Sequence, residues 1–241
     1  MGLTDDFVSV ADSSAFIFVG KIAERGNREG RTDGGTVTAA VSDVLKAPAG
    51  MGGLVGREVT VHLRSPLSEG TYVIFADPVS VGTTVTVRET AHLDGKQRDD
   101  AVAAIRRGYE ARLAPRLEAA TLVALGTIGD VTPVFPPAER RGRVPWALAP
   151  FGIERVLKGP RSRRRVTLIG PSPASKRLPR APALRAGVHA ILLLQEPPKD
   201  AIEHIPTRER QTAGFIAETS DIQPAEHGED IERILRNEGR E

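Results

Sequence analysis

The sequence predicts an all-β protein with flanking helices, arranged as two similar five-stranded barrels in tandem. Short runs rich in β-forming residues alternate with turns rich in Gly, Pro and Asp, which is typical of a barrel or sandwich. The second half of the chain also repeats the first half block by block. Finally, 241 residues with 40% hydrophobic and 27% charged residues suffice for two folded domains, and this composition excludes a disordered or fibrous chain.

The repeat consists of five pairs of matching blocks that keep the same order in both halves. In the first pair, the strand-like run 15–22 aligns its Gly20 with Gly126. The other pairs match 44–48 with 156–160, 59–61 with 166–168, 70–75 with 187–192, and Asp100 with Asp230. Collinear matches of this kind indicate one duplicated unit with insertions in the second copy. We therefore expect two domains, 1–114 and 115–241.

Each unit is expected to contain five strands. In the first unit, β-rich runs lie at 15–24, 36–46, 57–64, 71–77 and 83–90. In the second unit they lie at 120–130, 146–157, 164–169, 187–195 and 212–219. Five strands in about 110 residues match the oligonucleotide/oligosaccharide-binding (OB) barrel, a five-stranded, partly open Greek key. The predicted fold class is therefore two tandem five-stranded OB-like barrels with helices.

A helix is predicted to close the first unit over 98–113. Asp99 and Asp100 suit its N-terminus, and Pro115 is expected to end it. The helical spacing predicts an apolar face made of Val102, Ile105, Tyr109 and Leu113.

Three further helices follow from the same patterns. A helix over 229–237 is expected to close the second unit and to bury Ile231, Ile234 and Leu235. Short helices are expected to open both units, the first capped by Thr4 and the second spanning 113–119.

Four runs of the sequence resemble the netrin-like family, the version of this barrel that also occurs in tissue inhibitors of metalloproteinases. They are Phe18-Val19-Gly20-Lys21-Ile22, Phe151-Gly152-Ile153-Glu154-Arg155-Val156-Leu157-Lys158-Gly159, Val59-Thr60-Val61 and Gly70-Thr71-Tyr72-Val73-Ile74-Phe75. The resemblance implies a scaffold that binds proteins or other macromolecules. Inhibitors of this family chelate zinc through an N-terminal Cys, and this chain has no Cys. That mechanism is therefore not carried over.

No catalytic or cofactor-binding motif is present in the sequence. The absence of Cys excludes disulfides, thiolate nucleophiles and thiolate metal sites. The glycine-rich run 50–56 has Val55 where a dinucleotide-binding spacing needs Gly, so we interpret this run as a flexible loop. No Gly-x-Ser-x-Gly is present, although a triad assembled across the fold stays an alternative. We predict that the protein is not an enzyme and needs no cofactor.

The histidines do not form a metal-binding pattern. His62, His92, His189, His204 and His227 are scattered without paired ligand spacing, so solvated or singly bonded side chains are expected. One alternative places a metal on His92 and Asp94 together with Asp99 and Asp100. A polar turn that caps the following helix explains the same residues. We predict no metal site.

Basic residues concentrate in the second half of the chain. The formal net charge is only +2, yet residues 131–190 contain 13 Lys and Arg against 2 acidic residues. The candidate binding residues lie in three clusters between strands of the second unit: Arg140, Arg141 and Arg143; Arg161, Arg163, Arg164 and Arg165; and Lys176, Arg177 and Arg180. Three interpretations stay open: a solvated surface, an acidic protein partner, and single-stranded nucleic acid. The acidic partner of the second interpretation includes the chain's own segment 196–241.

These patterns favour a protein-binding module over a nucleic-acid-binding one. Aromatic residues make up only 4% of the chain, so few side chains are available to stack on bases. We predict a non-catalytic adaptor, regulator or inhibitor-like protein, whose loops 170–185 and 196–211 form the contact surface. The alternative is a protein that binds single-stranded nucleic acid through the basic region of the second domain.

The sequence favours a cytoplasmic protein without a membrane partner. Its first residues lack the basic and apolar regions of a signal peptide, and no apolar run approaches the roughly 20 residues of a membrane span. The alternative is an exported protein whose signal peptide has been removed.

Overall fold

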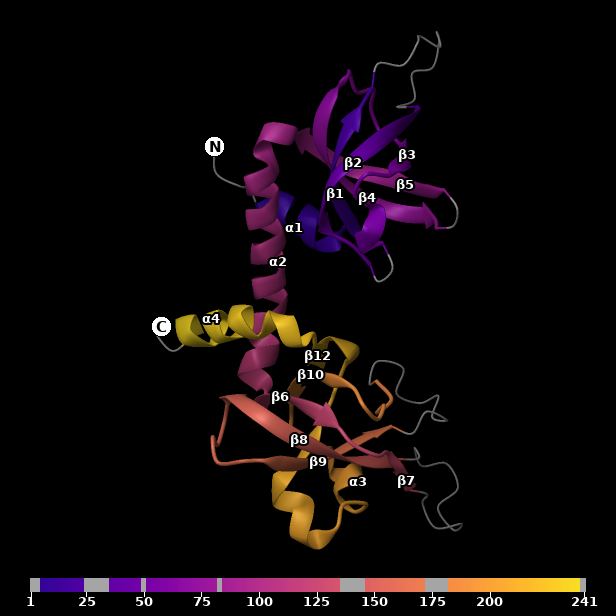
Figure 1. The fold of residues 1–241 in the computed structure, drawn as a ribbon. Helices are drawn as coiled ribbons and strands as arrows, with labels where there is room; N and C mark the ends of the chain where they lie inside the picture. Colours follow the sequence, from indigo (N-terminus) through magenta and orange to yellow (C-terminus); the bar gives the residue numbers. More distant parts are fainter. Residues whose placement is uncertain are drawn as a thin grey trace. The chain divides into compact units, whose positions relative to one another are not determined.

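The computed structural model describes residues 5–23, 35–48, 51–81, 84–134, 146–171 and 182–238. The chain divides into two compact units, Met1–Ala111 and Arg112–Glu241 (Figure 1). The division lies inside α2 (Arg98–Ala119), the same helix that contains the boundary predicted at 114/115. Thr4, the predicted cap of the first helix, lies outside the described residues.

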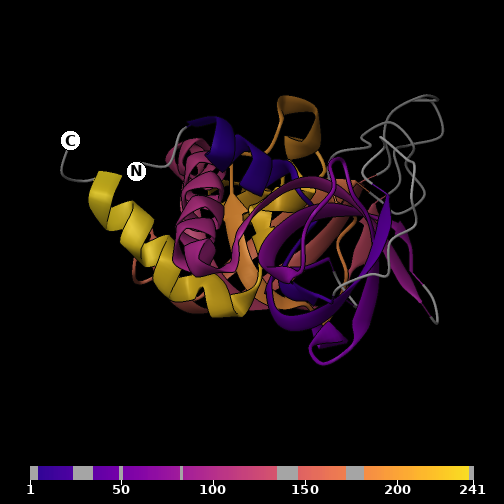
Figure 2. The same cartoon turned by 90° about the horizontal axis from the view of Figure 1, so that it is seen from above.

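The first unit is a closed five-stranded barrel. Its strands are β1 (Phe16–Ile22), β2 (Thr36–Lys46), β3 (Glu58–His62), β4 (Gly70–Ser80) and β5 (Val85–Asp94), with the 3-10 turns η1 (Gly52–Leu54) and η2 (Gly95–Gln97) between them. The barrel order is β1-β2-β3-β5-β4, and β4 pairs with β1 to close it. β3 and β5 are parallel, whereas the other pairs are antiparallel. This order is that of an OB barrel, as predicted. Figure 2 shows these strands in indigo and purple curling around a common centre.

The first strand of this barrel, β1, is buried on both faces. Phe16 and Phe18 of β1 point into the barrel core, whereas Ile17 and Val19 point outward. The outward side chains pack against α1 (Asp5–Ser13) and the first half of α2 (Figure 1). Burial on both faces explains why this strand is a continuous apolar run rather than an alternating one.

The face that α2 presents to the barrel differs from the predicted one. Ala101 and Ala104 are buried, whereas Val102 is 41% exposed, so its placement on the apolar face is wrong. A Cβ atom at Gly108 would lie 2.9 Å from the Cβ of Asp12 in α1. Small residues therefore allow close approach of the helix, and close approach rather than side-chain size selects the buried face.

Pro115 does not end α2, which continues to Ala119. Proline lacks only its own N–H, so the helix loses one hydrogen bond there. The next turn is held by other contacts: Leu117 is fully buried, and the backbone N–H of Ala120 donates to the carbonyl of Arg116 over 3.0 Å. Tertiary contacts of this last turn therefore outweigh the proline penalty.

The second unit repeats most of the strand pairings of the first. Its strands are β6 (Leu122–Ile128), β7 (Thr132–Val134), β8 (Trp146–Lys158), β9 (Arg165–Pro171), β10 (His189–Leu194), β11 (Ala213–Phe215) and β12 (Ile222–Gln223). The sheet order is β11-β9-β8-β6-β10-β12, and β7 pairs with β8. β9 and β11 pair in parallel, as β3 and β5 do in the first unit. Helices and 3-10 turns complete the unit: α3 (Lys199–Ile202), η3 (Thr207–Thr212), η4 (Thr219–Asp221), η5 (Ala225–His227) and α4 (Gly228–Glu238).

The second sheet is not a closed ladder, so the prediction of a second closed barrel is not confirmed. The single fifth strand predicted at 212–219 ends at Phe215. The backbone then turns at η4, where Asp221 accepts a hydrogen bond from the backbone N–H of Glu218 over 2.9 Å. This capping box draws the chain into a 3-10 turn and breaks the strand. One isolated bridge, between Gln195 and Phe215, joins β11 to the end of β10.

Strand irregularities recur at equivalent positions of the two units. The β1–β2 register shifts between Ile17 and Phe18 and again between Val19 and Gly20. The β6–β8 register shifts at the residues that align with these, 123/124 and 125/126. A duplicated unit predicts such shared irregularities, because bulges persist within a family.

Two lysines at matching positions of the repeat make the same contacts. The Lys46 Nζ donates to the carbonyls of Ala11 and Asp12 over 3.0 and 2.6 Å, at the end of α1. The Lys158 Nζ donates to the carbonyls of Leu117 and Glu118 over 2.6 and 2.9 Å, at the end of α2. Both lysines thus satisfy carbonyls that the helix leaves unpaired, where a positive charge is favoured.

Among the helices that the structure describes, none combines the length and the apolar character needed to cross a membrane.

Candidate functional site

The structure describes one of the three predicted basic clusters. Arg161, Arg163, Arg164 and Arg165 lie in the turn between β8 and β9 and at the start of β9. The remaining candidates lie outside the described residues: Arg140, Arg141, Arg143, Lys176, Arg177 and Arg180. We call residues 159–165 the arginine hairpin.

The arginine hairpin presents its charges to solvent. Gly159 has φ = +104°, a conformation that favours glycine and starts the turn, and the N–H of Arg163 donates to the carbonyl of Pro160 over 3.1 Å. Arg161, Arg164 and Arg165 are exposed, and Arg163 is half-buried. Within the described ranges, none of the four arginines forms an ion pair with a carboxylate. The Arg164 guanidinium donates to the carbonyl of Arg161 over 3.4 Å. The four arginines, which are close in the sequence, therefore lack a carboxylate partner among the described residues.

The hairpin continues into the outer face of the β8–β9 sheet. Alternation of side chains places Phe151 and Leu168 in the core, whereas Pro150 and Thr167 point outward. Pro150 lies opposite Thr167 in the register. β8 and β9 pair with each other as β2 and β3 do in the first barrel, and in OB barrels the face of strands two and three carries the ligand.

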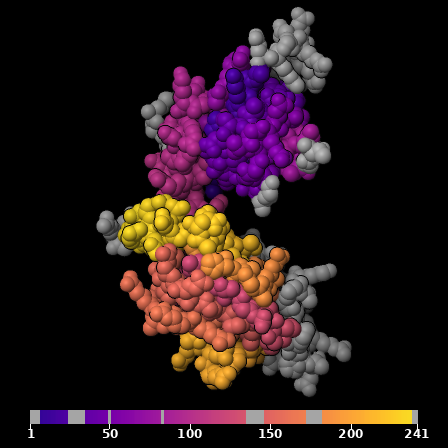
Figure 3. Space-filling model, viewed as in Figure 1, coloured from indigo at the N-terminus to yellow at the C-terminus, as the bar shows by residue number. Residues whose placement is uncertain are grey.

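The insertion 196–212 covers one end of this outer face. Ala201 and Ile205 of the insertion are buried against Trp146 and Ile169. The Trp146 and Phe215 rings meet edge to face with centroids 6.2 Å apart. The space-filling view shows the golden-orange insertion lying directly against the strands (Figure 3). Trp146 is thus buried and Phe215 is half-buried, which leaves little aromatic surface on this face for stacking on a ligand.

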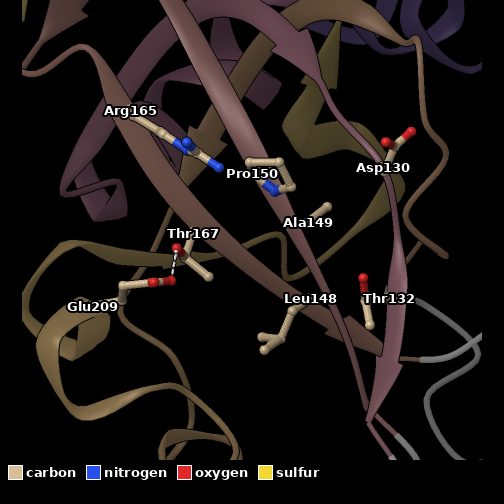
Figure 4. Close-up of a pocket in the computed structure, with 8 residues that line it drawn as sticks. All are labelled: Asp130, Thr132, Leu148, Ala149, Pro150, Arg165, Thr167 and Glu209. Atoms are coloured by element: carbon tan, nitrogen blue, oxygen red, sulfur yellow. Dashed lines mark hydrogen bonds between the residues drawn. The ribbon is translucent and has the colours of Figure 1, made fainter.

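The uncovered end of the face forms a small cavity with a volume of about 250 Å³ (Figure 4). Its floor is formed by Leu148, Ala149 and Pro150 of β8, of which Leu148 and Pro150 point outward and Ala149 has its side chain in the core. Its walls come from three other segments and are polar: Asp130 and Thr132, Arg165 and Thr167, and Glu209. In Figure 4 the Arg165 side chain extends from β9 toward Pro150. The arginine hairpin and the cavity therefore share Arg165.

Glu209 is a fixed anion in the cavity wall. The Thr167 hydroxyl donates to Glu209 Oε2 over 2.5 Å, and the Arg208 Nε lies 3.4 Å from Glu209 Oε1. The hydrogen bond from Thr167, followed by the charges of Arg208 and Arg165, lowers the pKa of Glu209 below its ordinary value against a smaller opposing effect of burial. Asp130, on the opposite wall, is exposed and has no hydrogen bond or ion pair to any other described residue.

The histidines are separate from this site. His92 donates through Nδ1 to Glu89 over 2.6 Å, His62 shares a hydrogen bond with Thr36 over 3.1 Å, and His189 lies 3.1 Å from Glu154. His204 has a buried Nε2 without a partner in the described part of the chain.

The predicted metal alternative on His92 and Asp94 is not assembled. Asp94 accepts a hydrogen bond from the N–H of Lys96 over 2.9 Å, and Asp99 pairs with Arg98 over 3.3 Å. Across the described ranges, no three His, Cys, Asp or Glu side chains are grouped as metal ligands would be.

Sequence reasoning identified the arginines and missed the cavity beside them. The alternation of Arg165, Thr167 and Ile169 along β9 is the signal that could have placed the first two on one face. Nothing in the local sequence indicates that Asp130 and Glu209, which lie 79 positions apart in the printed sequence, meet the same face. The sequence analysis also did not predict that Glu89 is a buried carboxylate, only 2% exposed.

Comparison with known proteins gives only distant similarities. No protein-family model matches the chain, and no curated protein matches it. A replication protein A heterotrimer bound to ssDNA aligns with 69% of this chain and 39% of its own at 11% identity and a TM-score of 0.16. A single-stranded DNA binding protein from Thermus aquaticus aligns with 85% of this chain and 89% of its own at 13% identity and a TM-score of 0.19. Such TM-scores establish no shared fold, and the OB order of the first barrel rests on its own strand pairing.

Proposed function

We propose that the second unit binds single-stranded nucleic acid, with the phosphates held by the arginine hairpin. The sequence analysis gave this function as the alternative to a protein-binding module. The observation that carries it is the cluster of four arginines, free of ion pairs to other described residues, at the edge of the face that OB barrels use for ligands. A guanidinium fork matches two phosphate oxygens at once, which makes arginine suited to this role.

The burial of the aromatic residues supports a phosphate-directed mode of binding. Trp146 is buried under the insertion and Phe215 is half-buried against it, so this face offers little aromatic surface on which successive bases could stack. Binding then depends on charge. The six further basic candidates precede β8 or follow β9 in the sequence, close to the ends of the same two strands.

The test is the affinity of the whole chain for a labelled single-stranded DNA of about 20 nucleotides. Replacing Arg163, Arg164 and Arg165 by Ala removes three phosphate contacts, so we expect a loss on the order of 100-fold at about 0.1 M salt. A control with the same charge change replaces Arg88, Arg106 and Arg107, which are exposed in the first unit. Retained affinity in the control supports the proposal, whereas equal losses in both variants would contradict it.

A protein-interaction module, without catalytic activity, is the second candidate. The packing of the insertion on Trp146 favours this candidate, because the insertion covers a surface that would otherwise be exposed for stacking on bases. The netrin-like resemblance points the same way. Capture from the native host with and without nuclease separates the candidates: a specific protein that stays bound after nuclease treatment favours this one.

We also propose that the second unit is an OB-like barrel of the same origin, opened at its fifth strand. The Gln195–Phe215 bridge supports this, because each N–H donates to the other residue's carbonyl over 3.0 Å. Hydrogen exchange is expected to show both amides protected like those of β10. Rapid exchange at both amides would contradict a stable bridge between β11 and the end of β10, and with it the proposed OB-like arrangement.

A further inference from the structure

We propose that the cavity on the β8–β9 face is a pocket for a single guanine base, so that the second unit prefers single strands containing guanine. This inference rests on the proposed function. It goes further by naming which part of the nucleic acid enters the cavity and which residue selects it.

The composition of the cavity suits a base better than a phosphate. Two carboxylates, Asp130 and Glu209, stand on its walls, and a phosphate placed between them would be repelled. The phosphates instead bind the arginine hairpin, which lies beside the cavity. Base edges carry hydrogen-bond donors, and carboxylate oxygens accept from them.

The floor and the size of the cavity fit one planar ring system. Leu148, Ala149 and Pro150 offer an apolar surface, and Arg165 extends toward Pro150 (Figure 4). A guanidinium plane stacks on an unpaired base when no aromatic ring is present, and its N–H edge stays free to donate to a phosphate. A volume of about 250 Å³ is below the range of pockets for drug-sized ligands and suits a fragment such as one base, while the rest of the strand stays outside the cavity.

Asp130 provides the selectivity for guanine. Both of its oxygens are free of hydrogen bonds to other described residues, whereas Glu209 already binds Thr167 and Arg208. Guanine is the base with two adjacent donors, N1–H and N2–H, on its Watson–Crick edge, and they match two carboxylate oxygens. Adenine, cytosine, thymine and uracil each place an acceptor beside the donor, and that acceptor would face the second oxygen.

The experiment compares oligothymidylates that differ at one central position. The strands carry thymine, guanine or inosine there; inosine lacks the N2 amino group. A bidentate pair discriminates by about 1–3 kcal/mol, so the guanine strand is expected to bind about 5- to 150-fold more tightly than the thymine strand. The inosine strand is expected to lose most of that gain.

Two variants locate the effect. Asp130→Asn offers one acceptor and one donor in place of two acceptors, so it is expected to abolish the preference for guanine, measured as the ratio of the affinities for the guanine and thymine strands. Asp200→Asn, an exposed acid on α3 outside the cavity, is the matched control and is expected to keep the preference.

The outcomes separate this inference from the proposed function. Binding of all strands with equal affinity, or a guanine preference that survives in Asp130→Asn, overturns the guanine pocket and leaves the phosphate-binding hairpin standing. Failure of every strand to bind overturns both. A purified protein partner that binds at the cavity and loses affinity in Asp130→Asn, without any guanine preference, also overturns the inference.

Discussion

At the scale of single residues, Lys46 and Lys158 explain why the block Val-Leu-Lys occurs in both halves of the sequence. Each lysine follows Val-Leu near the end of a long strand and reaches the last carbonyls of the preceding helix. A cation at this end interacts favourably with the helix dipole as well as with the carbonyls. The block Val-Leu-Lys therefore recurs because it ties a strand to a helix in each unit.

Replacing Lys158 by Met is expected to lower the free energy of unfolding by about 1.5–3 kcal/mol, the usual contribution of hydrogen bonds to a charged donor. Methionine keeps most of the apolar stem, so the loss reports the charge and its two hydrogen bonds. Chemical denaturation of the variant measures it, and Lys199→Met, exposed on α3, serves as the control. An unchanged denaturation midpoint in Lys158→Met would show that the contact contributes nothing.

Glu209 gives a pH dependence with a defined sign. Its pKa in the folded chain lies below the ordinary value of 4.5, because the ionised form accepts the hydrogen bond from Thr167 and lies near Arg208 and Arg165. The carboxylate therefore contributes stability above pH 4.5, and this contribution disappears as the pH falls through its folded pKa. The stability difference between the natural chain and Glu209→Gln is expected to shrink on acidification. A difference that grows toward low pH would contradict this role.

At the scale of secondary-structure elements, alternation and turn residues predicted most of the strands. The predicted and observed bounds of β2 are the same, 36–46, because Gly and Pro mark both of its ends and its apolar residues alternate. The failures have tertiary causes. Pro115 lies inside α2 because Leu117 and Lys158 hold the turn that follows it. The predicted fifth strand ends early because the chain turns at Asp221, which accepts a hydrogen bond from Arg116.

Arg116 links the end of α2 to the turn that interrupts the fifth strand. It donates to Asp221 over 2.9 Å and to Glu218 over 2.7 Å, and Asp221 is fully buried. Burial opposes the charge of Arg116, but the bonds to Asp221 and Glu218 outweigh it and raise the pKa of the guanidinium above its ordinary value. No residue spacing in the sequence indicates this contact across more than a hundred positions.

Asp221→Asn is expected to destabilise the second unit by about 3–5 kcal/mol, because it removes the charge that pairs with the half-buried Arg116 and keeps one acceptor oxygen for the two groups that donate to Asp221. Thermal unfolding followed by circular dichroism measures the loss. Asp230→Asn, a half-buried acid in the first turn of α4 that pairs with Arg233 over 2.7 Å, is the comparison variant. Equal melting temperatures for the natural chain and Asp221→Asn would contradict a structural role for the network.

At the scale of the whole molecule, the two units share a strand order and differ in what lies on the outer face. In the first barrel, neighbouring strands present Thr38, Thr60 and Thr86 in one row. In the second unit, the corresponding face bears Arg165 and receives Glu209 from the insertion. The sequence predicted the duplication and the basic character of the second unit. It did not predict the cavity, because the cavity depends on where the insertion folds.

The measurement that tests the central claim most directly is the salt dependence of single-stranded DNA binding. If the arginine hairpin holds the phosphates, the plot of log affinity against log salt has a negative slope near −0.7 for each phosphate bound. Replacing Arg163, Arg164 and Arg165 by Ala is then expected to flatten the slope by about two units, while the control in Arg88, Arg106 and Arg107 leaves it unchanged. Parallel lines for the natural chain and the hairpin variant would contradict the account.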